Sequence, residues 1–228
     1  MGTVHNSVKS AGIAVTLAIF LTALFSSFFN IAYAKETHLT IADNAESIKP
    51  LQVGDKAPKF TVKDTDGEQV IFDPNQLDSP TLIVVYRGGW CPYCNVQLQD
   101  LRKVLPEIRE KGVNVMFLSG DRPEILYSGL KEQTQEEIDG LDYKIYSDAD
   151  MEASSALGIA FNSSGFGMTL LKLKPSTSGS SLRKHNALPV PAVFVINKDG
   201  EVTYSFVDPN FKVRLPAEDV LAAVDTAL

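Results

Sequence analysis

Residues 81–94 constrain the fold more than any other part of the chain. Six apolar or β-branched residues, 81–86, form a run that is typical of a strand buried on both faces. An Arg-Gly-Gly-Trp sequence ends the run, and Cys91 and Cys94, the only two cysteines of the chain, follow it. Apolar residues then recur every three or four positions, which predicts a helix over about 94–111 with a kink at Pro106. The cysteine pair is therefore expected where a buried strand ends and a helix begins.

The remaining patterns predict one α/β domain over residues 51–228. Two turn dipeptides, Asp66-Gly67 and Asp199-Gly200, each join two strands into a hairpin. Strands are expected at 60–63, 70–72, 81–86, 113–118, 143–146, 192–196 and 202–206. Further helices are expected from 121, from about 148 and over 216–228, with no clear period over 162–187. Strands that alternate with helices predict a mostly parallel central sheet, and the last hairpin adds an antiparallel edge.

The first 34 residues are typical of a targeting segment. Lys9 is the only Lys or Arg among them, no acid is present, and an apolar run follows at about 13–29. Ala32-Tyr33-Ala34 then forms an A-x-A cleavage pattern. This order predicts a secretory signal peptide over 1–34, with an uncleaved membrane anchor at residues 11–29 as the alternative. We expect residues 35–50 to form a tether and the domain to be exported, into a bacterial periplasm.

The charge distribution limits which classes of binding partner are expected. A formal net charge of −7 argues against a nucleic-acid partner, because phosphate binding requires clustered cations. Residues 153–198 differ from the rest, since they contain no Asp or Glu. Two interpretations of this stretch stay open, a positive rim beside the cysteines and a solvated variable loop. The rim would consist of Lys172, Lys174, Arg183 and Lys184.

The C-x-x-C pair has three interpretations. A zinc site normally requires four ligands, and neither His38 nor His185 lies at ligand spacing from a partner, so we expect no metal and no cofactor. A purely structural disulfide would close a very small loop, and the stabilisation that a disulfide provides grows with loop length. The third interpretation is redox catalysis.

Redox catalysis suits the predicted position of the pair. The free N–H groups and the dipole at a helix N-terminus favour a thiolate and lower a cysteine pKa from ~8.5 into the range of roughly 3.5–7.5. We expect Cys91 to lie exposed just before the helix and to act as the nucleophile. Cys94, one turn into the helix and more buried, would resolve the mixed disulfide. Trp90 would shield one side. Arg87 neighbours the pair, and two interpretations stay open for it, a charge that favours the thiolate and a solvated arginine at a strand end.

The motif resembles a known superfamily. Trp90 to Cys94, after a strand, is similar to the active site of the thioredoxin fold in its Cys-Pro-Tyr-Cys, glutaredoxin-type form. Residues 53–60, 188–200 and 206–209 resemble the peroxiredoxin-like branch of the alkyl hydroperoxide reductase / thiol-specific antioxidant family, and the resemblance covers roughly 51–228. It implies a thioredoxin-like α/β fold, with a central mixed sheet flanked by helices and an extra N-terminal hairpin, and thiol-based antioxidant chemistry.

The chain departs from that family at three positions. The resemblance implies a Thr or Ser hydroxyl where this chain has Gly88, a proline where it has Val84, and an arginine where it has Pro191. Thioredoxin-like reductases instead keep a cis-proline at the last of these places. We therefore predict that Val190-Pro191 is a cis bond that presents a backbone edge to the substrate.

Three functions follow from the sequence. The first is an exported thiol oxidoreductase that cycles Cys91 and Cys94 between dithiol and disulfide and binds substrate at Trp90, Val190 and Pro191. The second is a thioredoxin-dependent hydroperoxide reductase that uses the same two cysteines, and the third is a non-catalytic binding domain with a structural disulfide. Expected partners are protein disulfides or small hydroperoxides and a thiol reductant protein, with membrane contact only through an uncleaved N-terminal segment.

Overall fold

The structure is a computed structural model of the 228-residue chain, and it describes residues 1–2 and 39–228. The expected signal peptide or anchor lies, apart from its first two residues, outside the described part. Among the described residues, no helix is both long enough and apolar enough to cross a membrane.

A seven-stranded mixed sheet forms the centre of the domain, in the order β2-β1-β5-β4-β3-β8-β9. The strands are β1 (Phe60–Lys63), β2 (Gln69–Phe72), β3 (Thr81–Tyr86), β4 (Asn114–Ser119), β5 (Ile145–Ser147), β8 (Ala192–Ile196) and β9 (Val202–Val207). β3, β4 and β5 are parallel, whereas β8, β9 and the N-terminal hairpin pair antiparallel. The two hairpins and a mixed sheet were predicted, but the expectation of a mostly parallel sheet is wrong, because only the β3–β4 and β4–β5 pairings are parallel. A separate pair, β6 (Ala160–Asn162) and β7 (Ala187–Pro189), is antiparallel.

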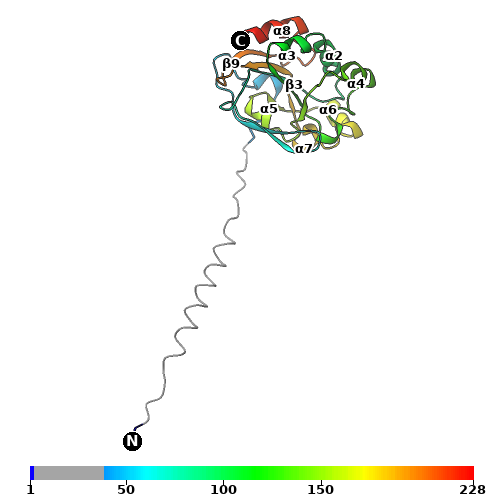
Figure 1. Ribbon diagram of the computed structural model, residues 1–228. Helices are drawn as coiled ribbons and strands as arrows, with labels where there is room; N and C mark the ends of the chain where they lie inside the picture. Colours follow the sequence, from blue (N-terminus) through cyan, green and yellow to red (C-terminus); the bar gives the residue numbers. More distant parts are fainter. Residues whose placement is uncertain (3–38) are drawn as a thin grey trace. The chain divides into compact units, whose positions relative to one another are not determined.

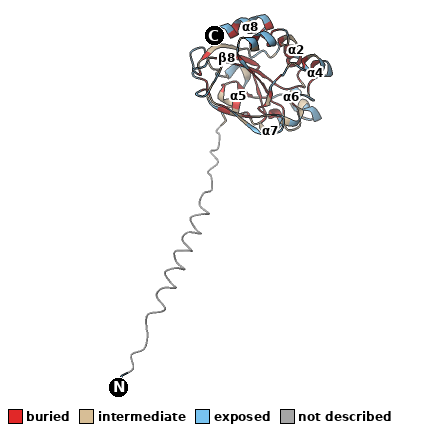
Figure 2. Ribbon diagram, viewed as in Figure 1, coloured by how far each residue is buried: buried red, intermediate tan, exposed pale blue. Residues whose placement is uncertain are grey.

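Helices cover the two faces of the sheet (Figure 1). One core contains side chains of α2 (Pro92–Leu101), α3 (Leu105–Glu110), α4 (Glu132–Ile138) and α8 (Ala217–Val224), and the other contains side chains of α5 (Glu152–Ala156), α7 (Ser181–His185) and the N-terminal hairpin. Alternate residues of β3 belong to opposite cores, because successive side chains of a strand point to opposite faces. Every residue of β3 and β8 is buried, and Figure 2 shows this part of the sheet in red.

Helical elements also occupy regions where the sequence pattern did not predict them. Residues 162–187 contain α6 (Phe166–Lys172), the 3-10 turn η3 (Pro175–Thr177) and α7. The helix expected from 121 is a 3-10 turn, η2 (Pro123–Ile125), and α4 follows it. Two further 3-10 turns are η1 (Ala45–Ser47) and η4 (Asp225–Ala227).

The single kinked helix predicted over 94–111 is wrong, because two helices occupy this region. α2 ends at Leu101 and α3 starts at Leu105. Pro106 stands in the first turn of α3. A proline lacks an N–H and clashes with the preceding turn, so it is tolerated at a helix start and not in its interior. The chain therefore begins a new helix at the proline instead of bending an old one.

Residues 39–50, which we expected to form a tether, pack against the domain. Ala42 donates its N–H to the carbonyl of Ala160 and accepts from the N–H of Asn162, at 2.9 and 2.8 Å. Lys49 donates to the carbonyl of Gly158, where a Cβ would lie 2.0 Å from the Lys49 oxygen. Glycine at 158 thus permits the close approach of the two backbones, and the segment is part of the folded unit.

Candidate active site

Cys91 is the N-cap residue of α2, and Cys94 lies in the first turn of that helix, as predicted. The Cys91 N–H donates to the carbonyl of Gly88 at 3.1 Å. The Cys91 carbonyl accepts from the N–H groups of Cys94 and Asn95, both at 3.2 Å. Pro92 occupies the first helical position, where its missing N–H has no intrahelical partner to lose. The sulfurs therefore lie at the positive end of the helix, next to the C-terminal end of β3.

The expectation that Cys91 is exposed is wrong. Only 2% of Cys91 and 0% of Cys94 are accessible to solvent, and both belong to the core beneath α2. The segment before α8 packs onto this end of the helix: the Phe211 ring meets the Tyr93 ring edge-on at 5.7 Å. Cys91 is covered by residues that are distant in the sequence, which a local pattern does not reveal.

Two arginines face the cysteine pair. Arg214 directs Nη2 at the Cys94 sulfur, 3.6 Å away. Arg87 is only 6% exposed, and its guanidinium lies 4.4 Å from the centre of the Phe211 ring and 5.5 Å from that of Phe161. Burial lowers the pKa of Arg87 from its ordinary value, while both sulfurs act to raise it. Within the described residues, neither arginine forms an ion pair with a carboxylate.

These surroundings shift the pKa values of the two thiols in opposite directions. The pKa of Cys91 is lowered to about 6, chiefly because the Cys94 thiol donates a hydrogen bond to its sulfur. The Cys94 N–H, Arg214 and Arg87 lower this pKa further, against the opposing effect of burial. Burial raises the pKa of Cys94 well above its ordinary value, and the hydrogen bond to Cys91 adds to the effect. At neutral pH, Cys91 is therefore the thiolate and Cys94 the thiol.

The loop between β3 and α2 is held by buried polar groups. Asn95, 1% exposed, donates from Nδ2 to the carbonyls of Gly89 and Cys91, at 2.7 and 2.9 Å, and accepts from the Lys131 N–H at 2.9 Å. The Gly89 N–H donates to Oδ2 of Asp121 at 2.6 Å. The side chain of Asn95 thus ties the nucleophile loop to the loop before α4.

Gly88 is required by close packing and by its backbone angle. Its φ of +148° is one that residues with side chains rarely adopt. A Cβ at this position would lie 2.5 Å from Nε1 of Trp90 and 2.7 Å from Oδ1 of Asp121. The glycine therefore allows the indole and the carboxyl group to approach the loop from two sides.

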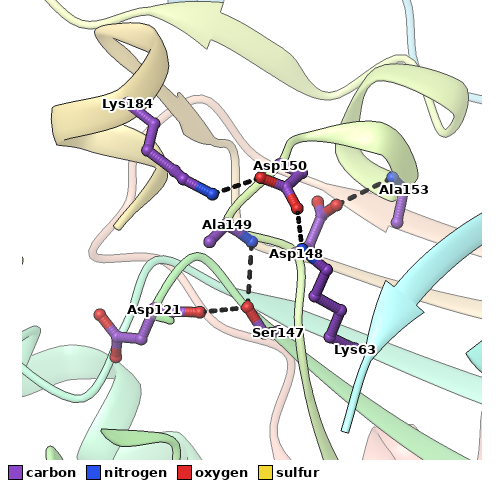
Figure 3. A network of polar contacts seen from close by, with 8 residues as sticks. All are labelled: Lys63, Asp121, Ser147, Asp148, Ala149, Asp150, Ala153 and Lys184. Atoms are coloured by element: carbon purple, nitrogen blue, oxygen red, sulfur yellow. Dashed lines mark hydrogen bonds and ion pairs between the residues drawn. The ribbon is translucent and has the colours of Figure 1, made fainter. Parts of the chain in front are cut away.

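Asp121, just after β4, is an acidic residue that contacts this loop through the Gly89 N–H. Burial raises its pKa to about 6, against the hydrogen bonds from Gly89 and Ser119, and the charge of Cys91 raises it further. The Asp121 backbone carbonyl accepts from Oγ of Ser147 at 2.6 Å. Figure 3 shows this bond and shows that the Asp121 carboxyl group points away from the neighbouring cluster around Asp150.

Comparison with known proteins agrees with this geometry. Residues 53–205 match the AhpC/TSA family, and this span includes both cysteines and Arg87 but not Arg214. The chain belongs to the AhpC/TSA family.

Curated relatives include a peroxiredoxin and a thiol-disulfide oxidoreductase. Peroxiredoxin Bcp of Escherichia coli strain K12 is 34% identical over 122 residues, 54% of this chain and 74% of the relative. Thiol-disulfide oxidoreductase ResA of Bacillus thuringiensis strain Al Hakam is 22% identical over 165 residues, 72% of this chain and 75% of the relative. The AhpC/TSA protein described here is therefore an enzyme of the thiol-dependent peroxidase and oxidoreductase class.

Solved structures show the same fold. Peroxidoxin BcpB of Mycobacterium tuberculosis superposes with a TM-score of 0.52 at 18% identity, over 77% of this chain and 97% of that one. A peroxiredoxin-like protein of Aquifex aeolicus gives a TM-score of 0.55 at 19% identity, over 84% and 99%. These likenesses confirm the thioredoxin-like fold of this AhpC/TSA chain.

The predicted cis bond between Val190 and Pro191 is wrong. Among the described residues, every peptide bond is trans. Both residues are buried, and the Val190 N–H donates to the carbonyl of Ile159 at 2.9 Å. The pairing of Ala192 with Val85 nevertheless brings this segment beside the end of β3, where the cysteine loop starts.

Trp90 is half-buried and packs against both cores of the AhpC/TSA fold, and its Nε1 has no hydrogen-bond partner in the described part.

The cations that act on the thiolate are not those of the acid-free stretch. Lys184 pairs with Asp150, and Lys172 donates to Oδ1 of Asn186. The charges that lower the pKa of Cys91 come from Arg214 and Arg87. The sequence singled out Arg87 but not Arg214, which lies 120 residues beyond Cys94 and outside any motif.

No metal centre is found in the part of the chain that the structure describes. There, no group of three or more His, Cys, Asp or Glu side chains is placed to hold a metal ion.

Proposed function

We propose that this protein is an exported thiol oxidoreductase that cycles Cys91 and Cys94 between dithiol and disulfide. The observation that carries the proposal is the position of both cysteines at the start of α2, where Nη2 of Arg214 lies 3.6 Å from the Cys94 sulfur. A hydrogen bond from Cys94 and the charges of Arg214 and Arg87 lower the pKa of Cys91 to about 6. An ionised nucleophile then lies beside a protonated thiol that can resolve the intermediate it forms. Two reactions use this arrangement.

With a disulfide as substrate, the Cys91 thiolate attacks one sulfur of the substrate. The substrate S–S bond breaks, and its second sulfur leaves as a thiolate that takes up a proton. Cys94 then loses its proton and attacks the Cys91 sulfur of the mixed disulfide, which releases the other substrate sulfur. The substrate gains two electrons and the protein becomes the Cys91–Cys94 disulfide. Trp90, Val190 and Pro191, around the start of the helix, are the proposed substrate contacts.

With a hydroperoxide as substrate, the Cys91 thiolate attacks the terminal oxygen. The O–O bond breaks, the alcohol leaves with a proton, and Cys91 becomes a sulfenic acid. Cys94 condenses with the sulfenic acid, which forms the disulfide and releases water. This second candidate is favoured by the likeness to peroxiredoxin Bcp. It is disfavoured by Gly88, which supplies no hydroxyl to position a peroxide.

Stopped-flow kinetics tests the proposal and separates the two substrates. Reduced full-length protein is mixed with hydrogen peroxide or with an oxidised protein such as insulin, and thiol loss is followed. We expect thiol–disulfide exchange with the protein disulfide to be faster than the reaction with peroxide. In Cys94→Ser, each reaction should stop at its intermediate, a mixed disulfide or a sulfenic acid that dimedone traps. If Cys91→Ser reacts as fast as the unmodified protein with both oxidants, the pair is not catalytic and a binding domain with a structural disulfide is the better description.

Export is part of the proposal and has its own support. Lys9, the apolar run at 13–29 and the A-x-A pattern at 32–34 have the order of a secretory signal peptide. N-terminal sequencing of the protein recovered from a periplasmic fraction should begin at Lys35. Recovery of the intact N-terminus in a membrane fraction would favour an anchor, and recovery in the cytoplasm would overturn export.

A further inference from the structure

Arg87 and Arg214 place two positive charges at one end of α2 without a carboxylate partner among the described residues. Arg87 is almost fully buried between two aromatic rings, and its Nε has no hydrogen-bond partner there. Arg214 uses Nη1 for the carbonyls of Phe211 and Val213 and Nη2 for the Cys94 sulfur, and its Nε is also unpartnered in the described part. Arg214 thus contacts the sulfur of the protonated Cys94, and its charge also favours the Cys91 thiolate.

The two redox states of the pair differ in how well they match these charges. In the dithiol state, Cys91 is ionised, and the charges of Arg214 and Arg87 favour that thiolate, while Nη2 of Arg214 lies 3.6 Å from the Cys94 sulfur. In the disulfide state, both sulfurs are neutral, so the buried Arg87 and the half-buried Arg214 lose their counter-charge. Buried charges without a partner are costly, and interactions that exist in one state only shift the equilibrium toward that state. The arginines therefore stabilise the dithiol relative to the disulfide.

One carboxyl group opposes this effect. Asp121 approaches the same loop through Gly89, and an ionised Asp121 repels the Cys91 thiolate. Asp121 is nevertheless engaged by the Gly89 N–H and by Oγ of Ser119, whereas Arg214 contacts the Cys94 sulfur directly. Two cations against one carboxyl group leave a net preference for the thiolate.

We propose that Arg87 and Arg214 make the Cys91–Cys94 disulfide an oxidant, which the protein donates to dithiols of other proteins. The inference rests on the proposed cycling of the pair and assigns its working direction. A disulfide whose reduced form is selectively stabilised is readily reduced, and so oxidises other thiols. The class of substrate is a polypeptide with two free thiols.

The proposed transfer balances without a further reactant. A substrate thiolate attacks the Cys91 sulfur, the Cys91–Cys94 bond breaks, and Cys94 leaves and takes up a proton. The second substrate thiol loses its proton and attacks the substrate sulfur of the mixed disulfide, which releases Cys91 as the thiolate that the arginines face. The substrate loses two electrons and gains a disulfide. A hydroperoxide, the second candidate substrate above, would reoxidise the pair and leave as alcohol and water.

Equilibration of the full-length protein with reduced and oxidised glutathione tests the inference. Alkylation of free thiols followed by gel electrophoresis gives the fraction of dithiol at each ratio, with thioredoxin as reference. We expect a disulfide about a hundredfold more easily reduced than that of thioredoxin, which corresponds to about 60 mV for two electrons. Arg214→Gln should move the equilibrium about tenfold toward the disulfide, or about 30 mV. Arg214→Lys, which keeps the charge, should restore most of the difference.

Arg102→Gln is the matched control. Arg102 follows α2 immediately, but it pairs with Glu137 at 3.0 Å and does not contact the sulfurs, so this substitution should leave the equilibrium unchanged. Arg87→Gln provides an independent second variant with the same expected direction as Arg214→Gln. In a parallel assay, the oxidised protein should form a disulfide in a synthetic dithiol peptide, and faster than Arg214→Gln does.

The outcomes separate the inference from the proposed function. A disulfide that forms but is no easier to reduce than thioredoxin overturns the inference and leaves cysteine cycling intact. Equal equilibria for Arg214→Gln, Arg87→Gln and Arg102→Gln overturn the role of the arginines. Failure to form any disulfide at any glutathione ratio overturns the proposed function, and the inference with it.

Discussion

Nη2 of Arg214 lies 3.6 Å from Sγ of Cys94, although 120 residues separate them along the chain. The family resemblance implies an arginine at the position of Pro191, at the start of β8. Here Arg214, on the segment between β9 and α8, supplies a cation to the cysteines. Electrostatic stabilisation of a thiolate depends on distance and burial rather than on the strand that supplies the charge. A cation at this site can therefore come from a different place in the fold.

Removal of the resolving thiol should raise the pKa of the nucleophile. The hydrogen bond from Cys94 is the largest contribution that lowers the pKa of Cys91 to about 6. In Cys94→Ala, the thiolate absorbance at 240 nm should therefore appear at higher pH than in the unmodified protein. In Cys91→Ala, the remaining Cys94 should stay protonated and resist iodoacetamide at neutral pH, because burial raises its pKa. A midpoint that stays at about 6 in Cys94→Ala would show that the arginines alone stabilise the thiolate.

Loss of the Asn95 side chain should destabilise the fold. Three hydrogen bonds of this buried amide would be broken, and the carbonyls of Gly89 and Cys91 and the Lys131 N–H would lose a partner. We expect Asn95→Ala to lower the free energy of unfolding by ~1–3 kcal/mol, measured by urea denaturation. Gln133→Ala, which removes an exposed amide bonded to Glu137, is the control and should change stability by less than ~0.5 kcal/mol. Equal losses for the two variants would contradict the role assigned to Asn95.

Gly88→Ala should lower the free energy of unfolding by more than backbone strain alone would. Gly112 also has a positive φ, +77°, but a Cβ there would have nothing within 4 Å. We expect Gly112→Ala to cost ~1 kcal/mol of unfolding free energy, from backbone strain. At Gly88, the new methyl group would also meet Trp90 and Asp121, so the loss should exceed ~2 kcal/mol and the alkylation rate of Cys91 should change. A loss at Gly88 no larger than at Gly112 would argue against the close packing described here.

Ionisation of Asp148 should make the protein less stable as the pH rises from about 4 to about 7. Burial raises the pKa of Asp148 from 3.8 to about 7, despite hydrogen bonds from Ala153 and Ser154. The folded state thus binds more protons than the unfolded state between about pH 4 and 7, and the free energy of unfolding falls as pH increases over that window. Asp148→Asn should flatten this dependence in urea denaturation at pH 5 and 7.5.

Asp150 serves as the matched control for Asp148. It lies two residues away, but Lys63 and Lys184 hold its pKa below the ordinary value. Figure 3 shows both ion pairs beside the buried Asp148. Stability from this group is present above the ordinary pKa of 3.8 and is lost as the pH falls below it. Asp150→Asn should therefore leave the change between pH 5 and 7.5 intact, and a flattened profile in this variant would contradict the assignment to Asp148.

The sequence by itself determined the elements that depend on local pattern. The buried run of β3, the two Asp-Gly hairpins and a helix that starts at the cysteine pair were all predicted, because side-chain period and turn residues act over a few positions. The same local reasoning proposed Cys91 as the nucleophile and Cys94 as the resolving thiol. It was correct about where the sulfurs lie along the chain.

Only the tertiary structure decided what surrounds those sulfurs. The burial of Cys91, the trans bond before Pro191, the packing of residues 39–50 and the approach of Arg214 depend on contacts between distant segments. No period or spacing in the sequence records such contacts, since they arise when elements pack together and exclude water. The pKa of a thiol is set by that packing, through charge, hydrogen bonding and desolvation. The sequence thus located the reactive sulfur, and the fold determined its ionisation.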